Sequence, residues 1–188
     1  MNASWETLTQ AVKECTDCRL CERRTNTVLG EGKPDADLMF IGEGPGRDED
    51  LQGRPFVGAS GQLLDRMIHA LGMERCDVYI CNIVKCRPPM NRNPEPDEAG
   101  ACIKYLRQQF LLVRPKVIVL LGKVAMRYVL NDVRPISALR GQFIEKKGVW
   151  FLPTYHPSAL LRDPSKKREA WEDFKAAKEK LKELTGDV

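Results

Sequence analysis

Apolar residues occur in two kinds of run along the chain, and these predict two kinds of secondary structure. Four short, nearly continuous apolar runs, ADLMFIG, DVYICNIVKC, PKVIVLLG and VWFLP, are typical of strands buried on both faces of a sheet. Longer segments repeat apolar residues every three or four positions, which is the spacing of one face of a helix. This spacing predicts helices over residues 4–23, 58–72, 97–110, 122–130 and 163–184, with Asp97 as the N-cap of the third.

The order of these segments predicts the fold class. Strands alternate with helices, and strands that are connected through helices run parallel. We therefore expect a three-layer α/β/α sandwich around a central sheet of four mainly parallel strands. A hairpin or short edge strands are expected around Lys147–Gly148. A chain of 188 residues is long enough for one such domain and short for two, so residues 1–188 are predicted to form a single domain.

Composition narrows the class of protein only a little. Apolar residues make up 43% of the chain and charged residues 30%, a balance that argues against wholesale disorder. No apolar run approaches the roughly 20 residues of a membrane span, and the first ten residues do not resemble a signal peptide. We expect a cytoplasmic protein with no membrane partner and, by default, a monomer. The net charge of +4 is only a weak indication of an anionic partner.

Seven cysteines in a chain expected in a reducing compartment favour metal binding or buried thiols over disulfides. Cys15 and Cys18 form a C-x2-C pair, which brings two thiolates onto one metal ion or cluster. Cys86 and Cys102 can supply two further ligands if the proline-rich loop between them folds back, and Cys21 could replace either member of the pair. Zinc and a [4Fe–4S] cluster both accept four thiolates, so the spacing leaves the choice between them open.

The four predicted strands end in loops of unusual composition. GEGPG follows the first strand, residues 82–86 end the second, Gly122 follows the third and TYHPS follows the fourth. The carboxyl ends of parallel strands meet at one edge of a sheet, and ligands of open α/β folds bind at that edge. The sequence therefore predicts a site where these four loops converge.

Three side chains near this edge suit a flat polar ligand. Phe56 lies in a polar loop between glycines, where it can join the core or act as a stacking platform. Asn82 lies in an apolar strand and must satisfy both ends of its amide, either within the protein or by pairing with a base. His156 follows a strand and precedes a proline, a position that aims the imidazole at the edge.

Charged residues around the same loops indicate which ligand is suitable. GEGPG lacks the Lys-Ser/Thr of a P-loop and the third glycine of a dinucleotide fingerprint. Glu43 and Glu49 would repel a bare phosphate and suit a ligand with N–H donors, such as a base edge. After His156, the pair Leu160–Leu161 could wedge into a DNA stack while Arg162 meets phosphate. The alternative is that these residues are the hydrophobic start of the last helix.

Taken together, these stretches resemble the family 4 uracil-DNA glycosylases, the iron–sulfur type found in many bacteria and archaea. The matching stretches are GEGPGRDEDLQGRPFVGASGQLLD, NIVKCRPPMNRNPEPDE, LRGQF and YHPSALLR, with the C-x2-C pair near the N-terminus. Each piece is unspecific by itself, whereas the combination, which covers residues from about 15 to 175, is highly specific. The resemblance implies the glycosylase α/β/α sandwich. It also implies hydrolysis of the N-glycosidic bond of deoxyuridine in single- or double-stranded DNA, which leaves an abasic site.

The resemblance also implies a cofactor. A [4Fe–4S] cluster would be ligated by Cys15, Cys18, Cys86 and Cys102, which chooses iron–sulfur over zinc and leaves Cys21 as a bystander. The cluster is held to be structural in this family, and it would tie the N-terminal segment 1–30 to the body of the domain.

The roles of the pocket residues follow from the same resemblance. Glu43 and Gly44 would line the uracil pocket, Glu49 would close the side facing C5, Phe56 would stack on the base, Asn82 would read its Watson–Crick edge, and His156 would donate to O2. Ser158, Leu160, Leu161 and Arg162, within the segment 157–162, would contact DNA.

One position shapes the expected mechanism. Gly44 stands where the best-known glycosylase family has an Asp that activates water. We therefore expect catalysis to depend on stabilisation of the leaving base by His156, with Glu43 as the candidate that positions water.

Two other functions are compatible with parts of the sequence. One is a non-catalytic iron–sulfur module that binds nucleic acid, and the other is a metal-stabilised nucleotide-binding protein without activity on DNA. A binding module needs no polar pocket of the kind that Glu43, Phe56, Asn82 and His156 would form, so the presence of that pocket favours the glycosylase.

Overall fold

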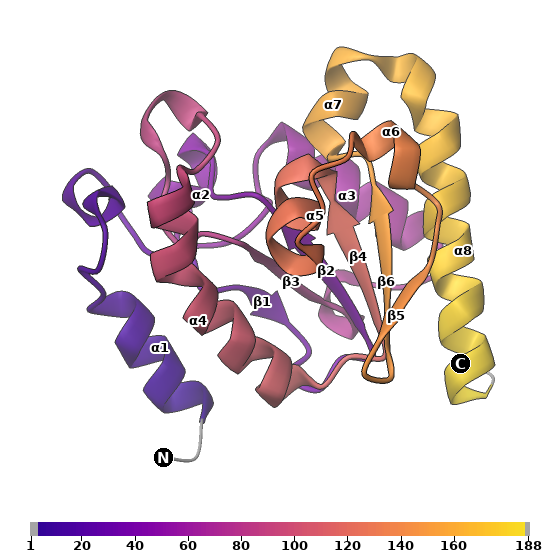
Figure 1. Ribbon diagram of the computed structural model, residues 1–188, viewed down its shortest axis with the longest axis horizontal. Coiled ribbons are helices and arrows are strands. Elements are labelled where there is room, and N and C mark those ends of the chain that lie inside the picture. Colours follow the sequence, from indigo (N-terminus) through magenta and orange to yellow (C-terminus); the bar gives the residue numbers. More distant parts are fainter. Residues whose placement is uncertain (1–3, 187–188) are drawn as a thin grey trace.

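The structure is a computed structural model that describes residues 4–186, and its centre is one sheet in the strand order β1-β3-β2-β4-β6-β5. The inner strands β2 (Leu38–Gly42), β3 (Tyr79–Asn82), β4 (Val117–Leu121) and β6 (Val149–Thr154) run parallel. β1 (Glu31–Gly32) and β5 (Ile144–Lys146) pair antiparallel at the two edges. The four predicted strands are thus confirmed, and the two edge strands widen the sheet (Figure 1).

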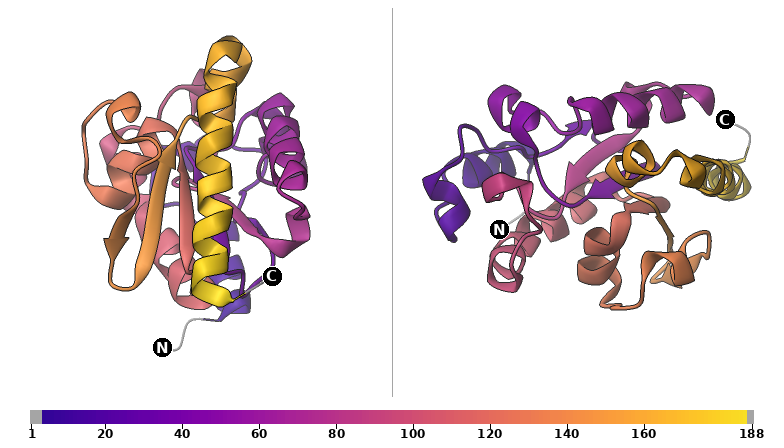
Figure 2. Two further views of the ribbon diagram at one scale, coloured as in Figure 1. Left: turned by 90° about the vertical axis from the view of Figure 1, so that its right-hand side faces the viewer. Right: turned by 90° about the horizontal axis from the view of Figure 1, so that it is seen from above.

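Helices cover both faces of this sheet, as expected for a three-layer sandwich (Figure 2). The α-helices are α1 (Trp5–Lys13), α2 (Arg47–Gln52), α3 (Ala59–Ala70), α4 (Pro96–Val113), α5 (Gly122–Leu130), α6 (Ile136–Leu139), α7 (Pro157–Arg162) and α8 (Lys167–Thr185). Short 3-10 helices are η1 (Arg19–Glu22), η2 (Arg75–Asp77), η3 (Pro89–Asn91) and η4 (Pro164–Lys166). Within the part of the chain that is described, no helix is both long and apolar enough to cross a membrane.

The alternation of side chains along the strands divides the core in two. In β2, Met39 and Ile41 pack with residues of α1, α4 and α5 on one face of the sheet. Leu38 and Phe40 pack with residues of α3, α7 and α8 on the other face. Every residue of β2 and β4 is buried, which explains why these strands appear in the sequence as continuous apolar runs.

Three predicted helix boundaries are wrong, each for a local reason. The helix predicted over 4–23 ends at Lys13, because the chain turns there and continues as η1 after Cys18. The third predicted helix begins at Pro96, one residue before Asp97, and the Glu95 N–H donates to Glu98 at 2.8 Å. The last predicted helix begins at Lys167, because α7 and η4 precede it as separate turns.

Candidate active site

A cavity of about 770 Å³ opens at the carboxyl ends of the parallel strands, where the sequence predicts the site. Its lining includes eight of the predicted site residues: Glu43, Gly44, Glu49, Phe56, Asn82, His156, Ser158 and Arg162. The proline-rich loop before α4 and the short helix α7 both rise above the strand ends (Figure 1). Residues from both segments line the cavity, so a large ligand at its entrance would contact the proline-rich loop on one side and α7 on another.

Asn82 lies at the bottom of this cavity, at the end of β3. Its partner in the neighbouring strand is Gly42, and the Ile83 N–H donates to the Gly42 carbonyl at 3.0 Å. The Asn82 side chain is 1% exposed, and its Oδ1 has no hydrogen-bond partner within residues 4–186. A Cβ on Gly42 would stand 2.4 Å from Oδ1, so a glycine is needed at this point. A buried acceptor without a donor is unfavourable in a free protein and suits a ligand that supplies an N–H.

The aromatic wall of the cavity is formed by Phe56 and His156. The two rings lie 5.6 Å apart between centroids, with their planes tilted by 32°. A Cβ on Gly42 would stand 2.5 Å from the Phe56 ring, which shows how closely this ring approaches the end of β2. Phe56 is therefore both a buried residue and a wall of the cavity, and its role as a stacking platform stays a prediction.

His156 is the N-cap residue of α7, and its ring is fixed by the residues that follow. The Ser158 N–H donates to Nδ1 at 3.1 Å, and the Ser158 hydroxyl lies 2.8 Å from the same atom. Burial, aided by the nearby charge of Arg162 and opposed by that of Glu49, lowers the pKa of His156 to about 4. The ring is therefore neutral at pH 7. Because Nδ1 accepts a hydrogen bond, the proton of the neutral ring is on Nε2.

A close approach of Gly122, the first residue of α5 after β4, to His156 completes this wall. Gly122 has a φ of +90°, and a Cβ at this position would stand 3.0 Å from the Cβ of His156. A side chain at position 122 would push the imidazole away and would also be strained by the positive φ. The glycine directly after β4 thus leaves room for the imidazole of His156 in the wall of the cavity.

Two carboxylates of the glycine-rich segment have different surroundings. Burial raises the pKa of Glu43, and the nearby guanidinium of Arg162 opposes that rise. The Glu49 carboxylate instead accepts hydrogen bonds from the backbone. Its Oε1 accepts from Val57 and Gly58, both at 2.8 Å, while its Oε2 accepts from Gly46 at 3.1 Å. Glu49 thus holds the Phe56 loop against the glycine-rich loop.

The predicted DNA-contacting segment, residues 157–162, forms the helix α7. Leu160 is 1% exposed and packs in the core under the helix, whereas Leu161 is 41% exposed. Ser158 and Arg162 line the cavity. Burial therefore removes Leu160 from the surface, and of the apolar pair it is Leu161 that is presented to a partner.

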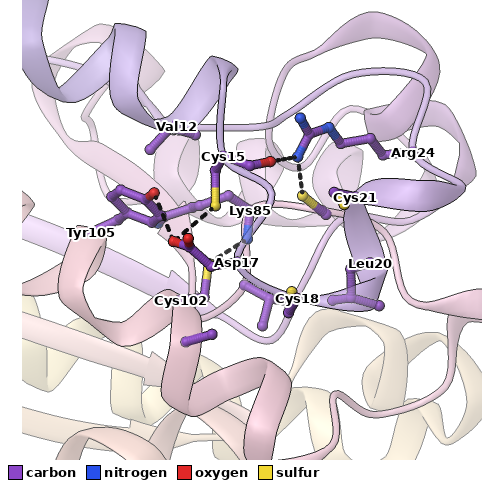
Figure 3. Close-up of a pocket in the computed structure, with 13 residues that line it drawn as sticks. Val12, Cys15, Asp17, Cys18, Leu20, Cys21, Arg24, Lys85, Cys102 and Tyr105 are labelled. Atoms are coloured by element: carbon purple, nitrogen blue, oxygen red, sulfur yellow. Dashed lines mark hydrogen bonds between the residues drawn. The ribbon is translucent and has the colours of Figure 1, made fainter.

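A second pocket gathers five of the seven cysteines. Cys15, Cys18 and Cys21 follow α1, and Cys102 lies in α4 (Figure 3). Cys86, which follows β3, also lines this pocket. The other two do not line this pocket: Cys76 is exposed, and Cys81 is buried in β3. The residues that the C-x2-C spacing and the proline-rich loop were expected to bring together are thus brought together.

The surroundings of these thiols are suited to an anionic metal centre. The Arg24 guanidinium donates to Cys86 Sγ at 3.3 Å and to the Cys15 carbonyl at 2.7 Å. The Lys85 backbone N–H donates to Cys102 Sγ at 3.3 Å. Burial raises the pKa of Cys86 and raises that of Cys102 to about 11, so both are protonated as free thiols. Cations and N–H donors around buried sulfur atoms would stabilise thiolates.

The spacing of the thiols bears on which metal centre fits. Among residues 4–186, no three His, Cys, Asp or Glu side chains are close enough to hold a single metal ion. Thiolates that bind one zinc ion must converge on one point, whereas each thiolate of a four-iron cluster binds a different iron and stands further from the others. Five thiols line one pocket, a donor set that either kind of metal centre accepts.

Several residues of the site were not expected from the sequence. Arg47, Asn91, Arg92 and Lys123 also line the cavity, and they come from α2, the proline-rich loop and α5. Part of this signal was present in the sequence, since each of these residues lies in the proline-rich loop or directly after one of the strand-end loops. Two further arginines could not be predicted, because each donates a hydrogen bond to a residue distant in the sequence. Arg24 donates to Cys86, and Arg75 donates to the Phe56 carbonyl.

Comparison with known proteins identifies the family. Residues 29–175 match the model of the uracil DNA glycosylase superfamily. The chain is 45% identical to a type-4 uracil-DNA glycosylase of Thermotoga maritima over 94% of both chains. It is 43% identical to that of Archaeoglobus fulgidus over 96% of this chain and 94% of the relative. It is 45% identical to that of Sulfurisphaera tokodaii over 94% of this chain and 84% of the relative. The chain belongs to the type-4 uracil-DNA glycosylases, within the uracil DNA glycosylase superfamily.

Proposed function

We propose that this glycosylase accepts a uracil turned out of DNA in the cavity at the strand ends and hydrolyses its N-glycosidic bond. The observation that carries this proposal is the Asn82 amide, which lines the cavity with an unpaired Oδ1. Uracil presents an N3–H donor next to its O4 acceptor, and one amide can pair with both. The buried acceptor costs stability of about 1–3 kcal/mol until a donor arrives, and a base-reading role explains why it is there.

The walls around Asn82 would hold the base by shape. Phe56 would stack on one face of the ring. A Cβ on Gly44 would stand 2.7 Å from a Val84 methyl, and its absence lets the backbone of the glycine-rich loop lie close to the residues that follow β3. Glu49 and the loop it holds would close the side facing C5, where a thymine methyl group would clash. Glu43 and Gly44 would line the remaining edge.

His156 would stabilise the leaving base. When the C1′–N1 bond breaks, its electron pair moves into the uracil ring and negative charge gathers on O2. The Nε2–H of the neutral imidazole can donate to that oxygen. A donor already fixed in place, as Ser158 fixes this ring, needs no reorganisation during the reaction. One such donor contributes about 3–4 kcal/mol to the barrier reduction.

A water molecule must then add to C1′ of the sugar cation. Glu43 is the candidate that positions this water and takes its proton, because it lines the cavity and Gly44 provides no carboxylate. Burial raises the pKa of Glu43, which makes its carboxylate a stronger base than an exposed one. The products are free uracil and an abasic site.

Helix α7 would hold the DNA while the base is out of the stack. Turning a base out costs a few kcal/mol, least at a mismatch. Leu161 would fill the space that the base leaves, and Ser158 and Arg162 would meet the flanking phosphates. Leu160 would not contact the DNA, because it is buried and anchors the helix to the core.

We propose that Cys15, Cys18, Cys86 and Cys102 hold a [4Fe–4S] cluster, with Cys21 nearby as a bystander. The thiols come from three segments that are distant in the sequence, so a shared cluster would join the N-terminal segment to the proline-rich loop and α4. When bound, the cluster would cross-link these three segments through its bonds to the cysteine sulfur atoms. The cysteine pocket and the catalytic cavity are lined by different sets of side chains, which supports a structural role.

The decisive experiment uses an oligonucleotide with a single uracil. Incubation with the cluster-loaded protein followed by alkali should cleave the strand at the uracil, and the same oligonucleotide with thymine at that position should stay intact. DNA binding measured on both oligonucleotides is the companion measurement. Binding without cleavage would overturn the enzymatic proposal and favour a non-catalytic nucleic-acid-binding module.

A further inference from the structure

The backbone of Phe56 has an unusual conformation. Its φ is +51°, in the left-handed region that residues with a Cβ rarely occupy. Such a conformation persists only where the surrounding structure holds it in place. The residue is also the aromatic wall of the cavity, so whatever holds its backbone also sets the position of its ring.

Arg75, in η2, holds this backbone from the carbonyl side. Its Nη1 donates to the Phe56 carbonyl at 3.1 Å, and its Nη2 donates to the Pro55 carbonyl. The guanidinium is itself fixed by two carboxylates. Nε donates to Glu31 at 2.8 Å and Nη1 donates to Asp65 at 2.7 Å. A planar fork with four of its N–H groups in use can hold two consecutive carbonyl groups at a set angle, which the single ammonium of a lysine cannot do.

Two other elements, α2 and α3, also contact the backbone of residues 56–58. The Glu49 carboxylate of α2 accepts from the N–H groups of the next two residues, Val57 and Gly58. Gly61 of α3 lies against the Phe56 backbone, where a Cβ would stand 1.9 Å from its carbonyl carbon. The strained residue is thus held by α2, α3 and η2 together, and among the residues described only Arg75 donates hydrogen bonds to the two carbonyls.

We propose that Arg75 is a positioning residue for uracil recognition, which acts by fixing the Phe56 ring against the base. The inference rests on the proposed function of Phe56 as the stacking platform. Arg75 is absent from the lining of the cavity, so it acts through Phe56 and not through the substrate. Loss of the fork lets the Pro55–Phe56 peptide relax toward an ordinary conformation, and the ring then turns away from the base.

The test compares Arg75→Met, Phe56→Leu and the double variant with the wild type, using a single-stranded uracil oligonucleotide. Arg54→Met is the matched control. The Arg54 side chain pairs with the same Glu31 at 2.7 and 2.8 Å and donates no hydrogen bond to the Pro55 or Phe56 carbonyl. The measurements are kcat and KM for uracil release, inhibition by free uracil, and circular dichroism. Uracil release by the wild type tests the proposed function separately, because the inference concerns only differences between variants.

The expected result is a loss of kcat/KM of about ten- to a hundredfold for Arg75→Met, with weaker inhibition by free uracil and an unchanged circular dichroism spectrum. Phe56→Leu should cost much less in the Arg75→Met background than in the wild type, because the ring is already misplaced. Arg54→Met should stay within about twofold of the wild type. If Arg75→Met does not fold, Arg75→Lys replaces it, with the same signs and smaller changes. Fully additive losses for the folded variants, or unchanged inhibition by uracil, would overturn the proposal.

Discussion

The Phe56 and His156 rings face each other with their centroids 5.6 Å apart, and a backbone hydrogen bond holds each ring's segment in place. Arg75 donates to the Phe56 carbonyl, and the Ser158 N–H donates to the imidazole of His156. The ring that would stack on the base and the ring that would polarise it are therefore set before any substrate arrives. A site arranged in this way loses little free energy to reorganisation when the base enters.

Replacement of His156 should affect the chemical step far more than the binding of DNA. In His156→Ala the donor to uracil O2 is lost, so kcat should fall about 10²- to 10³-fold. The dissociation constant for a uracil oligonucleotide should change by less than about threefold, because phosphate contacts dominate affinity for DNA. Single-turnover cleavage and fluorescence anisotropy give the two numbers. Equal losses in rate and in binding would contradict the role of the leaving-group donor.

The lowered pKa of His156 makes the stability of the protein depend on pH in a defined window. The unfolded chain takes up this proton below its usual pKa of 6.5, whereas the folded protein takes it up only near pH 4. Between these values the unfolded state binds more protons, so His156 makes the free energy of unfolding rise with pH from about 4 to 6.5. Urea unfolding of the wild type and of His156→Gln, compared at each pH, isolates this effect. A difference that stays constant across the window would show that the imidazole titrates normally.

Asn82 offers a case in which stability and activity should change in opposite directions. Asn82→Leu replaces an amide with an unpaired buried oxygen by an apolar side chain of similar size, so stability should stay the same or rise by about 1–2 kcal/mol. Uracil release should fall by about 10² or more, because the Watson–Crick edge is no longer read.

Cys81 gives the matched control. It precedes Asn82 in β3 and is buried in the half of the core that contains Met39 and Ile41. Cys81→Ala should lower stability by about 1 kcal/mol through the cavity it leaves and should preserve the rate of uracil release. Thermal unfolding and the alkali assay measure both effects. An Asn82→Leu protein that is clearly destabilised would mean that the amide has a structural partner.

The sequence was sufficient to predict most of the fold because the inner strands are buried on both faces. Short apolar runs rich in β-branched residues, such as 117–121, favour a buried strand over a helix, and their alternation with helices predicts a parallel sheet. The edge strand β1 was not predictable, because Glu31–Gly32 is short and polar and forms a strand only by pairing with β3. Helix boundaries failed where capping departed from the commonest pattern, as at Glu95.

The residues of the candidate site were predictable where position along the chain implies position in space. Asn82 and His156 follow strands, and the carboxyl ends of parallel strands share one edge. Arg75 was not predictable, because its importance comes from carbonyl groups about 20 residues away that only the folded chain brings near. The burial of Leu160 beside the exposed Leu161 also depends on how α7 sits on the core.

The assignment of the cluster ligands is tested by comparing two cysteines that line the same pocket. Cys86→Ser should remove the cluster's visible absorbance and lower the melting temperature, since a ligand that joins two segments is lost. Cys21→Ser should retain both the absorbance and the melting temperature, because Cys21 is the bystander. Iron and sulfide content per chain give the stoichiometry. If Cys21→Ser bleaches the protein and Cys86→Ser does not, the ligand set is wrong.

Glu98 should stabilise the connection between the N-terminal segment, the proline-rich loop and α4. Its buried carboxylate accepts from Arg92 at 2.7 and 2.8 Å, from Arg19 at 2.8 Å and from the Glu95 N–H at 2.8 Å. These hydrogen bonds, led by those from Arg92, lower the pKa of Glu98 to about 2 despite its burial. Its contribution to stability is therefore complete above pH 4.5 and is lost as the pH falls through 2.

At pH 7, Glu98→Gln should lower the free energy of unfolding by about 2 kcal/mol, because both arginines can still reach solvent and limit the loss. The difference from the wild type should shrink steadily as the pH is lowered below 4.5. Asp97→Asn is the matched control, since Asp97 also pairs with Arg19 but is largely exposed, and it should cost less than about 0.5 kcal/mol. Urea unfolding at a series of pH values checks both. A Glu98→Gln difference that persists at pH 2 would mean that packing, and not charge, holds these three segments together.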